Sequence, residues 1–162
     1  MRNLTERVAV CVATGLYSGF FPIVAGTVGT IPAWLIAYFV LRGDQSLIIS
    51  AAVVFSVLSV WSGTTCERLW GHDPKKIVMD EWAGMLVAVI ALPYTLTAYV
   101  IAFFAFRFFD VVKVPPAAQA ERLRSGWGIT MDDIIAGVYA NLFTRLVLYA
   151  LEHWWPELAG LN

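Results

Sequence analysis

Residues 46–66 read SLIISAAVVFSVLSVWSGTTC and contain no charged side chain. A helix rises about 1.5 Å per residue, so about 20 apolar residues cross the hydrocarbon core of a bilayer. Ser46–Cys66 is therefore predicted to be a membrane-spanning helix, and the rest of the chain is interpreted around it.

The composition of the whole chain is also that of a membrane protein. Its 162 residues are 59% hydrophobic and 14% charged, whereas soluble domains are about 45–50% apolar and about 25% charged. The mean hydropathy is +0.70. The length suits one domain, residues 1–162. Eleven basic and 12 acidic residues give a net charge of −1, so a basic nucleic-acid-binding module is excluded.

The cysteines and the N-terminus give weaker signals. Cys11 and Cys66 lie in apolar runs, so we expect small buried side chains rather than a disulfide or a zinc site. Glu6 interrupts the charged N-terminal region and no clean A-x-A site follows, so we do not expect a cleaved signal peptide.

Two further apolar segments are expected in the membrane. Ile134–Trp155 is long enough to span it and ends in two tryptophans, which are typical of the interface. Ile31–Leu41 is too short to span. The glycine-rich residues before it predict a re-entrant loop, which is tolerated where protein or water covers its backbone.

Trp82–Phe106 has two interpretations: one long span, or two short helices that turn at Pro93. We favour the hairpin, because proline lacks an N–H group and disfavours helix in the residue before it. The hairpin returns Asp80 and Arg107 to the same side of the membrane. The predicted fold is therefore an all-α, polytopic membrane bundle with short and re-entrant helices.

The hairpin also places most of the basic residues on one side. The segments 1–30, 67–81 and 107–133 then share a face and contain nine of the 11 Lys and Arg residues. These are Arg2, Arg7, Arg68, Lys75, Lys76, Arg107, Lys113, Arg122 and Arg124. By the positive-inside rule this face is cytoplasmic.

Five acidic residues on the cytoplasmic face are expected at helix ends: Asp80, Glu81, Asp110, Asp132 and Asp133. Clustered carboxylates repel one another unless a cation lies among them, and Mg²⁺ prefers oxygen ligands. Helix capping is the alternative, because Thr130-Met131-Asp132-Asp133 fits a capping box and Asp80-Glu81 suit a helix N-terminus. Capping does not explain why three acidic sites share one face.

Arg107, Asp110 and Lys113 recur at i, i+3 and i+6, so they share one side of a helix that Pro115-Pro116 ends. They either bind a phosphate and a metal, or form an ion-paired group in which the cations extend to the interface.

Two glycine segments precede expected helices. Residues 22–30, PIVAGTVGT, have the chemistry of an anion cradle formed by backbone N–H groups. The alternative is that Thr30 only caps a helix whose first turn contains Pro32. Gly126-Trp127-Gly128 is expected to be a loop that leads into Thr130.

Several phosphatase chemistries are excluded. The position six residues after Cys11 is Tyr17 and that after Cys66 is His72, so neither cysteine has the arginine that a cysteine phosphatase requires. No D-x-D-x-T motif is present, and the two histidines, His72 and His153, fall at opposite ends of the layout. Metal-assisted chemistry on a phosphate at the membrane surface remains.

Four blocks of sequence resemble the phosphatidylglycerophosphatase A family. Pro22–Thr30 matches P-x-x-P-G-T-x-G-[ST], with Ala25 for the second proline. His72-Asp73-Pro74 and Ile77–Met85 match H-D-P and I-V-x-D-E-x-x-G-M. Phe106–Pro116 matches F-R-x-x-D-x-x-K-P-x-P, with Val114 for a proline, and Gly126–Gly137 matches G-x-G-I-x-x-D-D-x-x-A-G. The two departures remove no polar group.

The resemblance implies a magnesium-dependent hydrolase of phospholipid biosynthesis in the bacterial inner membrane, which converts phosphatidylglycerophosphate to phosphatidylglycerol. Under this hypothesis Asp80, Glu81, Asp132 and Asp133 hold Mg²⁺, directly or through water. Arg107, Lys113, Thr27, Gly26 and Thr30 bind the phosphate. Asp110 and Thr27 are the catalytic candidates, with Asp110 either a ligand or the base for water. The number of metal ions, the nucleophile and selectivity among lipid phosphates stay open.

A small transporter or ion-conducting protein is the main alternative, since ionisable residues also occur within transporters. Such a protein would place carboxylates near mid-span, yet only Asn141 and Arg145 lie deep. These two either join helices or extend the site. A non-catalytic scaffold needs no clustered acids. Gly63, Gly84 and Gly137 allow close helix contacts within one subunit or in a homo-oligomer.

Overall fold

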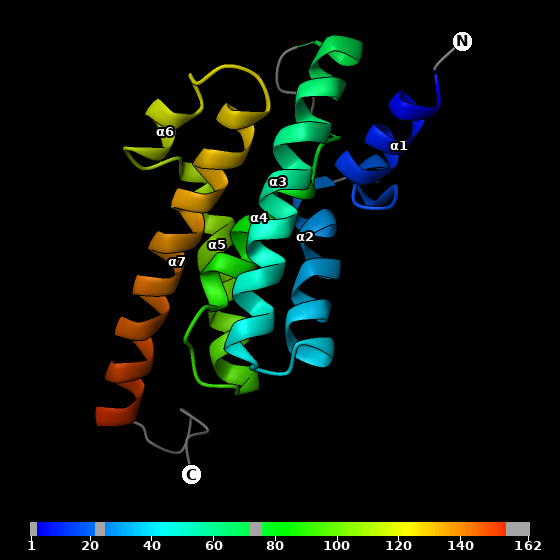
Figure 1. Cartoon of the computed structure of the whole chain (residues 1–162). Helices are drawn as coiled ribbons and strands as arrows, with labels where there is room; N and C mark the ends of the chain where they lie inside the picture. The colour runs from blue at the N-terminus through cyan, green and yellow to red at the C-terminus, as the bar shows by residue number, and fades with distance from the viewer. Residues whose placement is uncertain (1–2, 22–24, 72–75, 155–162) are drawn as a thin grey trace.

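The computed structural model describes residues 3–21, 25–71 and 76–154, and all regular elements in these ranges are helical, as Figure 1 shows. In chain order they are α1 (Leu4–Ala13), the 3₁₀ helix η1 (Ser18–Phe20), α2 (Ala25–Leu35), the π-helix η2 (Ile36–Val40), α3 (Gln45–Trp70), α4 (Met79–Val89), α5 (Leu96–Val112), α6 (Ala117–Ala120) and α7 (Gly126–Trp154). The all-α prediction is confirmed for the described residues.

Helices α3 and α7 are long and apolar enough to cross a membrane. Only 28% of the most apolar window of each helix is buried inside the protein, whereas the core helix of a soluble protein would be mostly buried. Large apolar side chains such as Val57 and Leu146 are exposed instead. A lipid environment accounts for such apolar outer faces, which would be polar in water.

The segment 82–106 is a helical hairpin, as predicted. Helix α4 ends at Val89 and α5 begins at Leu96, where the Thr95 hydroxyl accepts a hydrogen bond from the Ala98 N–H at 3.2 Å. Glu81, in the first turn of α4, lies 3.2 Å from Arg107 near the end of α5. The chain therefore returns to the end of the bundle from which α4 starts.

Two predicted helix starts were wrong, because α2 begins before Thr30 and α7 begins before Thr130. Thr30 lies inside α2, and Thr130 lies inside α7 together with Gly126–Gly128. Thr30 and Thr130 do not cap; each hydroxyl donates to the carbonyl four residues earlier, Gly26 and Gly126 respectively, at 2.7 Å. The glycine segments are helical because packing overrides their low helix propensity. Residues 22–24 of the predicted anion cradle lie outside the described residues.

Glycines bring α4 and α7 together. A Cβ atom at Gly84 would lie 2.6 Å from the Asp133 carbonyl oxygen, and one at Gly137 would collide with the Gly84 carbonyl. The two backbones therefore touch. Gly84 follows Asp80 by four residues, and Gly137 follows Asp133 by the same interval, so this crossing places both acidic pairs one turn away, at the same end of the bundle.

We expect Gly137→Ala to destabilise the protein by about 3 kcal/mol, because the added methyl meets backbone that cannot move aside. Thermal unfolding in detergent measures this, with Val138→Ala on the exposed face of α7 as the matched control. An unfolding temperature for Gly137→Ala equal to that of the control would contradict the close crossing.

Asn141 and Arg145 join helices and lie away from the acidic residues. The Asn141 amide donates to the carbonyls of Ala88 and Ile90 at 2.9 and 2.8 Å. Arg145 donates to the carbonyls of Ile90 and Ala91 at 3.1 and 2.9 Å. These bonds satisfy the carbonyl groups that the end of α4 leaves without helical partners. Gly63 packs within the chain too, since its Cβ would lie 3.3 Å from Gly126.

Candidate active site

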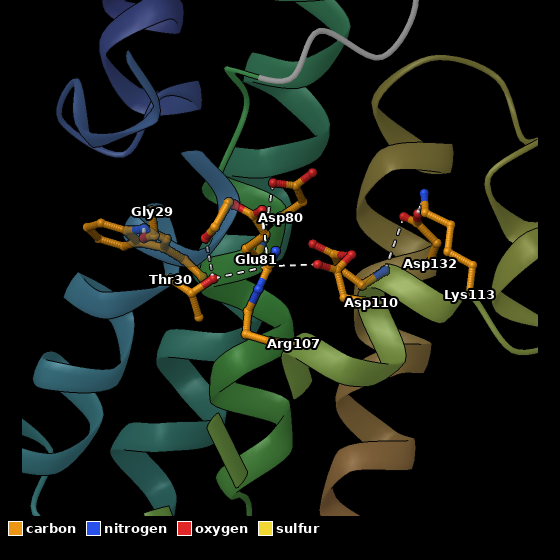
Figure 2. Close-up of polar contacts among 11 residues, drawn as sticks. Gly29, Thr30, Asp80, Glu81, Arg107, Asp110, Lys113 and Asp132 are labelled. Atoms are coloured by element: carbon orange, nitrogen blue, oxygen red, sulfur yellow. Dashed lines mark hydrogen bonds and ion pairs between the residues drawn. The ribbon is translucent and has the colours of Figure 1, made fainter. Parts of the chain in front are cut away.

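A cavity of about 940 Å³ lies where α4 and α7 begin and α5 ends. Its polar lining comes from four helices, α2, α4, α5 and α7, and from the turns beside them. The lining residues with polar or ionisable side chains are Thr27, Lys76, Asp80, Glu81, Arg107, Asp110, Lys113, Glu121, Asp132 and Asp133. Figure 2 shows most of these side chains pointing toward one another. The structure therefore brings together the predicted site residues, with the exception of Thr30.

The first acidic pair, Asp80 and Glu81, occupies the first turn of α4. Both residues are buried. Asp80 Oδ1 accepts the Glu81 N–H at 3.0 Å. Burial, together with the neighbouring Asp132 and Asp110 charges, raises the pKa of Asp80 to about 8. Burial, followed by the Asp80 charge, also raises the pKa of Glu81, although Arg107 opposes this shift.

The second pair, Asp132 and Asp133, repeats the local arrangement on α7. Asp132 Oδ1 accepts the Asp133 N–H at 3.1 Å, and both residues are buried. They lie in the second turn of α7 rather than at its start, so capping cannot explain them. The capping alternative therefore fails for this pair and survives only for Asp80 and Glu81.

Arg107 connects three helices at the cavity wall. Its Nη1 atom lies 2.7 Å from Asp110 Oδ2 on its own helix, 3.2 Å from Glu81 Oε1 on α4 and 3.3 Å from Thr30 Oγ1 on α2. These contacts fix the guanidinium at the cavity (Figure 2). Thr30 is fully buried behind the wall, where it positions Arg107 instead of lining the cavity.

Lys113 does not continue the helical face of Arg107 and Asp110. It adopts a left-handed conformation just after α5 ends, so its side chain reaches Asp132 Oδ2 at 2.7 Å and Glu121 Oε1 at 2.9 Å. Burial lowers the pKa of Lys113, but the hydrogen bonds to Asp132 and Glu121 have the larger combined effect. The pKa of Lys113 is therefore raised above its usual range. The lysine is thus a fixed positive charge beside the α7 acids.

The start of α2 forms the wall opposite these acids with Ala25, Gly26 and Thr27. The N-terminus of a helix attracts anions through its free N–H groups and its dipole. Of the predicted anion cradle, residues 25–30 therefore belong to α2 and not to a loop before a helix. A Cβ at Gly26 would collide with Glu81 Oε1 and lie 2.7 Å from Arg107 Nη2.

We expect Gly26→Ala to lower kcat/KM for the reaction at this site about 100-fold. The added methyl group would displace the Glu81–Arg107 pair, and a displacement of catalytic groups by about 1 Å can slow a reaction by this factor. Steady-state kinetics of purified protein measure the loss, and Ala25→Gly is the control. Equal activity of Gly26→Ala and wild type would show that the pair tolerates displacement.

The cavity is lined by more acidic than basic side chains. Six carboxylates line it, against the cations Lys76, Arg107 and Lys113. Glu81 Oε2 is buried without a hydrogen-bond partner among the described residues. A phosphate is repelled by such a site unless a further cation enters, and hard oxygen donors suit Mg²⁺. The donor set therefore fits this ion.

The carboxylates do not by themselves enclose a metal. Within residues 3–21, 25–71 and 76–154, no three His, Cys, Asp or Glu side chains converge on one point that could hold an ion. Magnesium usually takes only one or two carboxylates and completes its shell with water and substrate phosphate. One or two of these carboxylates would therefore suffice for Mg²⁺, with water and substrate phosphate as its other ligands.

Two charged lining residues were not singled out from the sequence. Glu121 pairs with Lys113 although it follows the short helix α6, and no sequence pattern predicted this turn. The sequence identified Lys76 only as a basic residue of the cytoplasmic face. Its position four residues before Asp80 could have indicated that it lies near the site. His72 lies outside the described residues.

Known proteins are similar to this chain over most of its length. The family model for phosphatidylglycerophosphatase A matches residues 11–148. A putative phosphatidylinositol-3-phosphatase of Bacteroides thetaiotaomicron is 37% identical over 90% of this chain and 93% of its own. The phosphatidylglycerophosphatase A of Escherichia coli is 35% identical, over 89% of this chain and 83% of its own. That of Haemophilus influenzae is 31% identical over 88% and 87%.

No solved structure matches the chain significantly. The matched residues include the cavity acids of α4 and α7 together with Arg107, Asp110 and Lys113. The chain belongs to the phosphatidylglycerophosphatase A family.

Proposed function

We propose that this phosphatidylglycerophosphatase hydrolyses the terminal phosphate monoester of phosphatidylglycerophosphate by a Mg²⁺-dependent attack of water at the cytoplasmic face of the bacterial inner membrane. The family supports the substrate and the hydrolase activity. The observation that carries the mechanism is the meeting of two buried acidic pairs, from α4 and α7, with Arg107 in one cavity.

The acidic pairs are the proposed Mg²⁺ ligands. The ion would be held, directly or through water, by Asp80, Glu81, Asp132 and Asp133. Neighbouring residues on a helix point about 100° apart. One residue of each pair can therefore bind the ion while the other orients that ligand. When bound, the ion supplies positive charge that screens the phosphate and favours ionisation of water. The raised pKa of Asp80 means that ion binding also releases a proton.

The phosphate-binding groups surround the acids. Arg107 and Lys113 would hold the nonbridging oxygens of the monoester, assisted by the hydroxyl of Thr27 and the N–H groups at the start of α2. All three of these side chains line the cavity. Lys113 would leave one of its two carboxylate partners to do so.

Asp110 is the proposed base. It faces the cavity from α5, and Arg107 fixes its orientation at 2.7 Å. Water would attack phosphorus in line with the ester oxygen while Asp110 accepts the water proton. The phosphorus–oxygen ester bond breaks, the released glycerol hydroxyl takes up a proton, and phosphatidylglycerol and inorganic phosphate leave.

The positions of the charges support the proposed membrane orientation. The cavity lies at the end of the bundle that contains α1, α6 and the start of α7 (Figure 1). The described basic residues gather at this end, apart from Arg42 and Arg145. We propose that α3 and α7 span the membrane, that α2 and the α4–α5 hairpin enter it, and that the cavity faces the cytoplasm.

Placement of the acids argues against the ion-conducting alternative. The carboxylates of the cavity gather at one end of the bundle, whereas a conducting pathway would need ionisable groups near mid-span. Asn141 and Arg145, the deep polar residues, are bonded to the carbonyls at the end of α4.

The test is release of inorganic phosphate from phosphatidylglycerophosphate by purified protein in neutral detergent micelles. Phosphatidylinositol 3-phosphate is the second substrate, because the name of the Bacteroides relative points to it. We expect faster release from phosphatidylglycerophosphate. Release only from the inositol lipid would replace the proposed substrate, and release from neither would overturn the lipid phosphatase assignment.

A further inference from the structure

Lys76 differs from the other two cations of the cavity. Arg107 is paired with Glu81 and Asp110, and Lys113 with Asp132 and Glu121. For Lys76 the contacts among the described residues are with aromatic rings: its Nζ lies 5.2 Å from the ring centroid of Phe20 and 5.7 Å from that of Trp70. Aromatic rings hold a cation without cancelling its charge. Lys76 is therefore placed at the cavity by rings and not by a carboxylate among the described residues.

The position of Lys76 is set by its backbone. A Cβ at Gly19 would collide with the Lys76 carbonyl oxygen, so η1 packs directly against it. Two residues later, the Val78 N–H donates to the Ala13 carbonyl at 2.8 Å. The lysine is thus attached to the α1–η1 side of the cavity, whereas Arg107 and Lys113 come from α5 and the turn after it.

The same side of the cavity is apolar and exposed. Phe20 and Phe21 line the cavity while remaining 44% and 52% exposed, and Leu16 and Tyr17 beside them are exposed as well. Exposed aromatic residues at a membrane surface lie at the level of the lipid headgroups. This wall is therefore the one that the glycerol backbone and acyl chains of a lipid would meet.

The substrate carries two phosphates of different kinds. The terminal one is a monoester, and the other is a diester that joins the headgroup to diacylglycerol. We propose that Lys76, held on Phe20 and Trp70, binds this phosphodiester while Arg107 and Lys113 bind the monoester. This inference rests on the proposed function. It makes Lys76 a residue that selects lipids with both phosphates over lipids with only a monoester.

The test compares phosphatidylglycerophosphate with phosphatidic acid of the same acyl chains, which has a monoester and no diester. Both are assayed in neutral detergent with wild type, Lys76→Met, Lys76→Arg and Arg7→Gln. Arg7 is the matched control, because it lines a neighbouring surface hollow with Phe20 but is absent from the cavity lining.

We expect Lys76→Met to lower kcat/KM for phosphatidylglycerophosphate about tenfold relative to phosphatidic acid, through KM, as is typical for loss of a charged hydrogen bond. Lys76→Arg should keep the ratio near that of wild type, and Arg7→Gln should leave it unchanged. An equal loss on both lipids would show general attraction of anionic lipids, and an unchanged ratio would show no contact. Either result overturns the proposal.

A binding measurement separates this proposal from the proposed function. Phosphatidylglycerol keeps the diester and lacks the monoester, so fluorescent phosphatidylglycerol in neutral detergent reports on this contact without turnover. We expect Lys76→Met to bind it about tenfold more weakly than wild type does. If wild type binds it through Lys76 yet releases no phosphate, the proposed function fails and the subsite stands. If wild type hydrolyses the substrate and Lys76→Met binds equally well, the subsite fails alone.

Discussion

Asp80→Asn and Asp133→Asn are each expected to reduce phosphate release from phosphatidylglycerophosphate by at least about a thousandfold. Each change replaces a carboxylate oxygen with an amide nitrogen, which cannot bind Mg²⁺. A bound ion stabilises the transition state by several kcal/mol. Each 1.36 kcal/mol of this stabilisation corresponds to about a tenfold change in rate. The two residues lie on different helices, so equal losses would show that α4 and α7 contribute to one centre.

The matched control is Asp44→Asn. Asp44 caps α3 at the other end of the bundle, where its Oδ1 accepts from the Ser46 and Leu47 N–H groups at 2.9 and 3.1 Å. Asparagine caps a helix equally well, so this variant should keep wild-type activity. Thermal unfolding of all three variants shows whether they fold. Near-wild-type turnover by a folded Asp80→Asn or Asp133→Asn protein would remove that residue from the site.

Arg107→Lys is expected to lower kcat/KM about 100-fold, and Arg107→Gln still more. A lysine keeps the charge but cannot contact Asp110, Glu81 and Thr30 together, because it lacks the planar fork of the guanidinium. Loss of one oriented donor to a developing charge typically costs about 10²–10³ in rate. Steady-state kinetics at several lipid concentrations show how much of the loss in kcat/KM comes from kcat and how much from KM.

Arg42→Gln is the control for this series, since Arg42 is exposed and lies in the turn between η2 and α3. It should have wild-type kinetics. If Arg107→Lys were as active as wild type, the contacts to three helices would have no part in catalysis, and Arg107 would be only a positive charge near the cavity.

Periodicity and helix-breaking residues predicted the arrangement of helices well. Ser46–Cys66 lies inside α3, and the hairpin at Pro93 brings Glu81 to Arg107 as expected. These predictions succeed because lipid requires long apolar helices and because Pro93 lacks the N–H that a continuous helix would need there.

Helix starts were predicted poorly where glycine and threonine precede them. Glycine normally weakens a helix, so residues near Gly26 and Gly126 were expected to be loops. In the structure the missing side chains admit neighbouring groups: Glu81 and Arg107 at Gly26, and the Val60 carbonyl at Gly126. Such tertiary contacts are not visible in a local sequence pattern.

The acidic residues and Arg107 were identified as site candidates from their shared face, but their partners were not. Lys113 was expected on the same helical side as Asp110. Its own left-handed backbone conformation instead directs its side chain to Asp132 and Glu121. The aromatic support of Lys76 depends on η1, which has only three residues and no periodic signal. Contacts made by turns could therefore be identified only in the structure.

The central claim is that the carboxylates of α4 and α7 act through Mg²⁺. Its most direct test is phosphate release from phosphatidylglycerophosphate by purified wild-type protein that has been stripped with chelator and then titrated with Mg²⁺. We predict no release from the stripped protein, recovery with Mg²⁺, and no recovery for Asp80→Asn over the same range. Full release by stripped wild-type protein in excess chelator would contradict the claim.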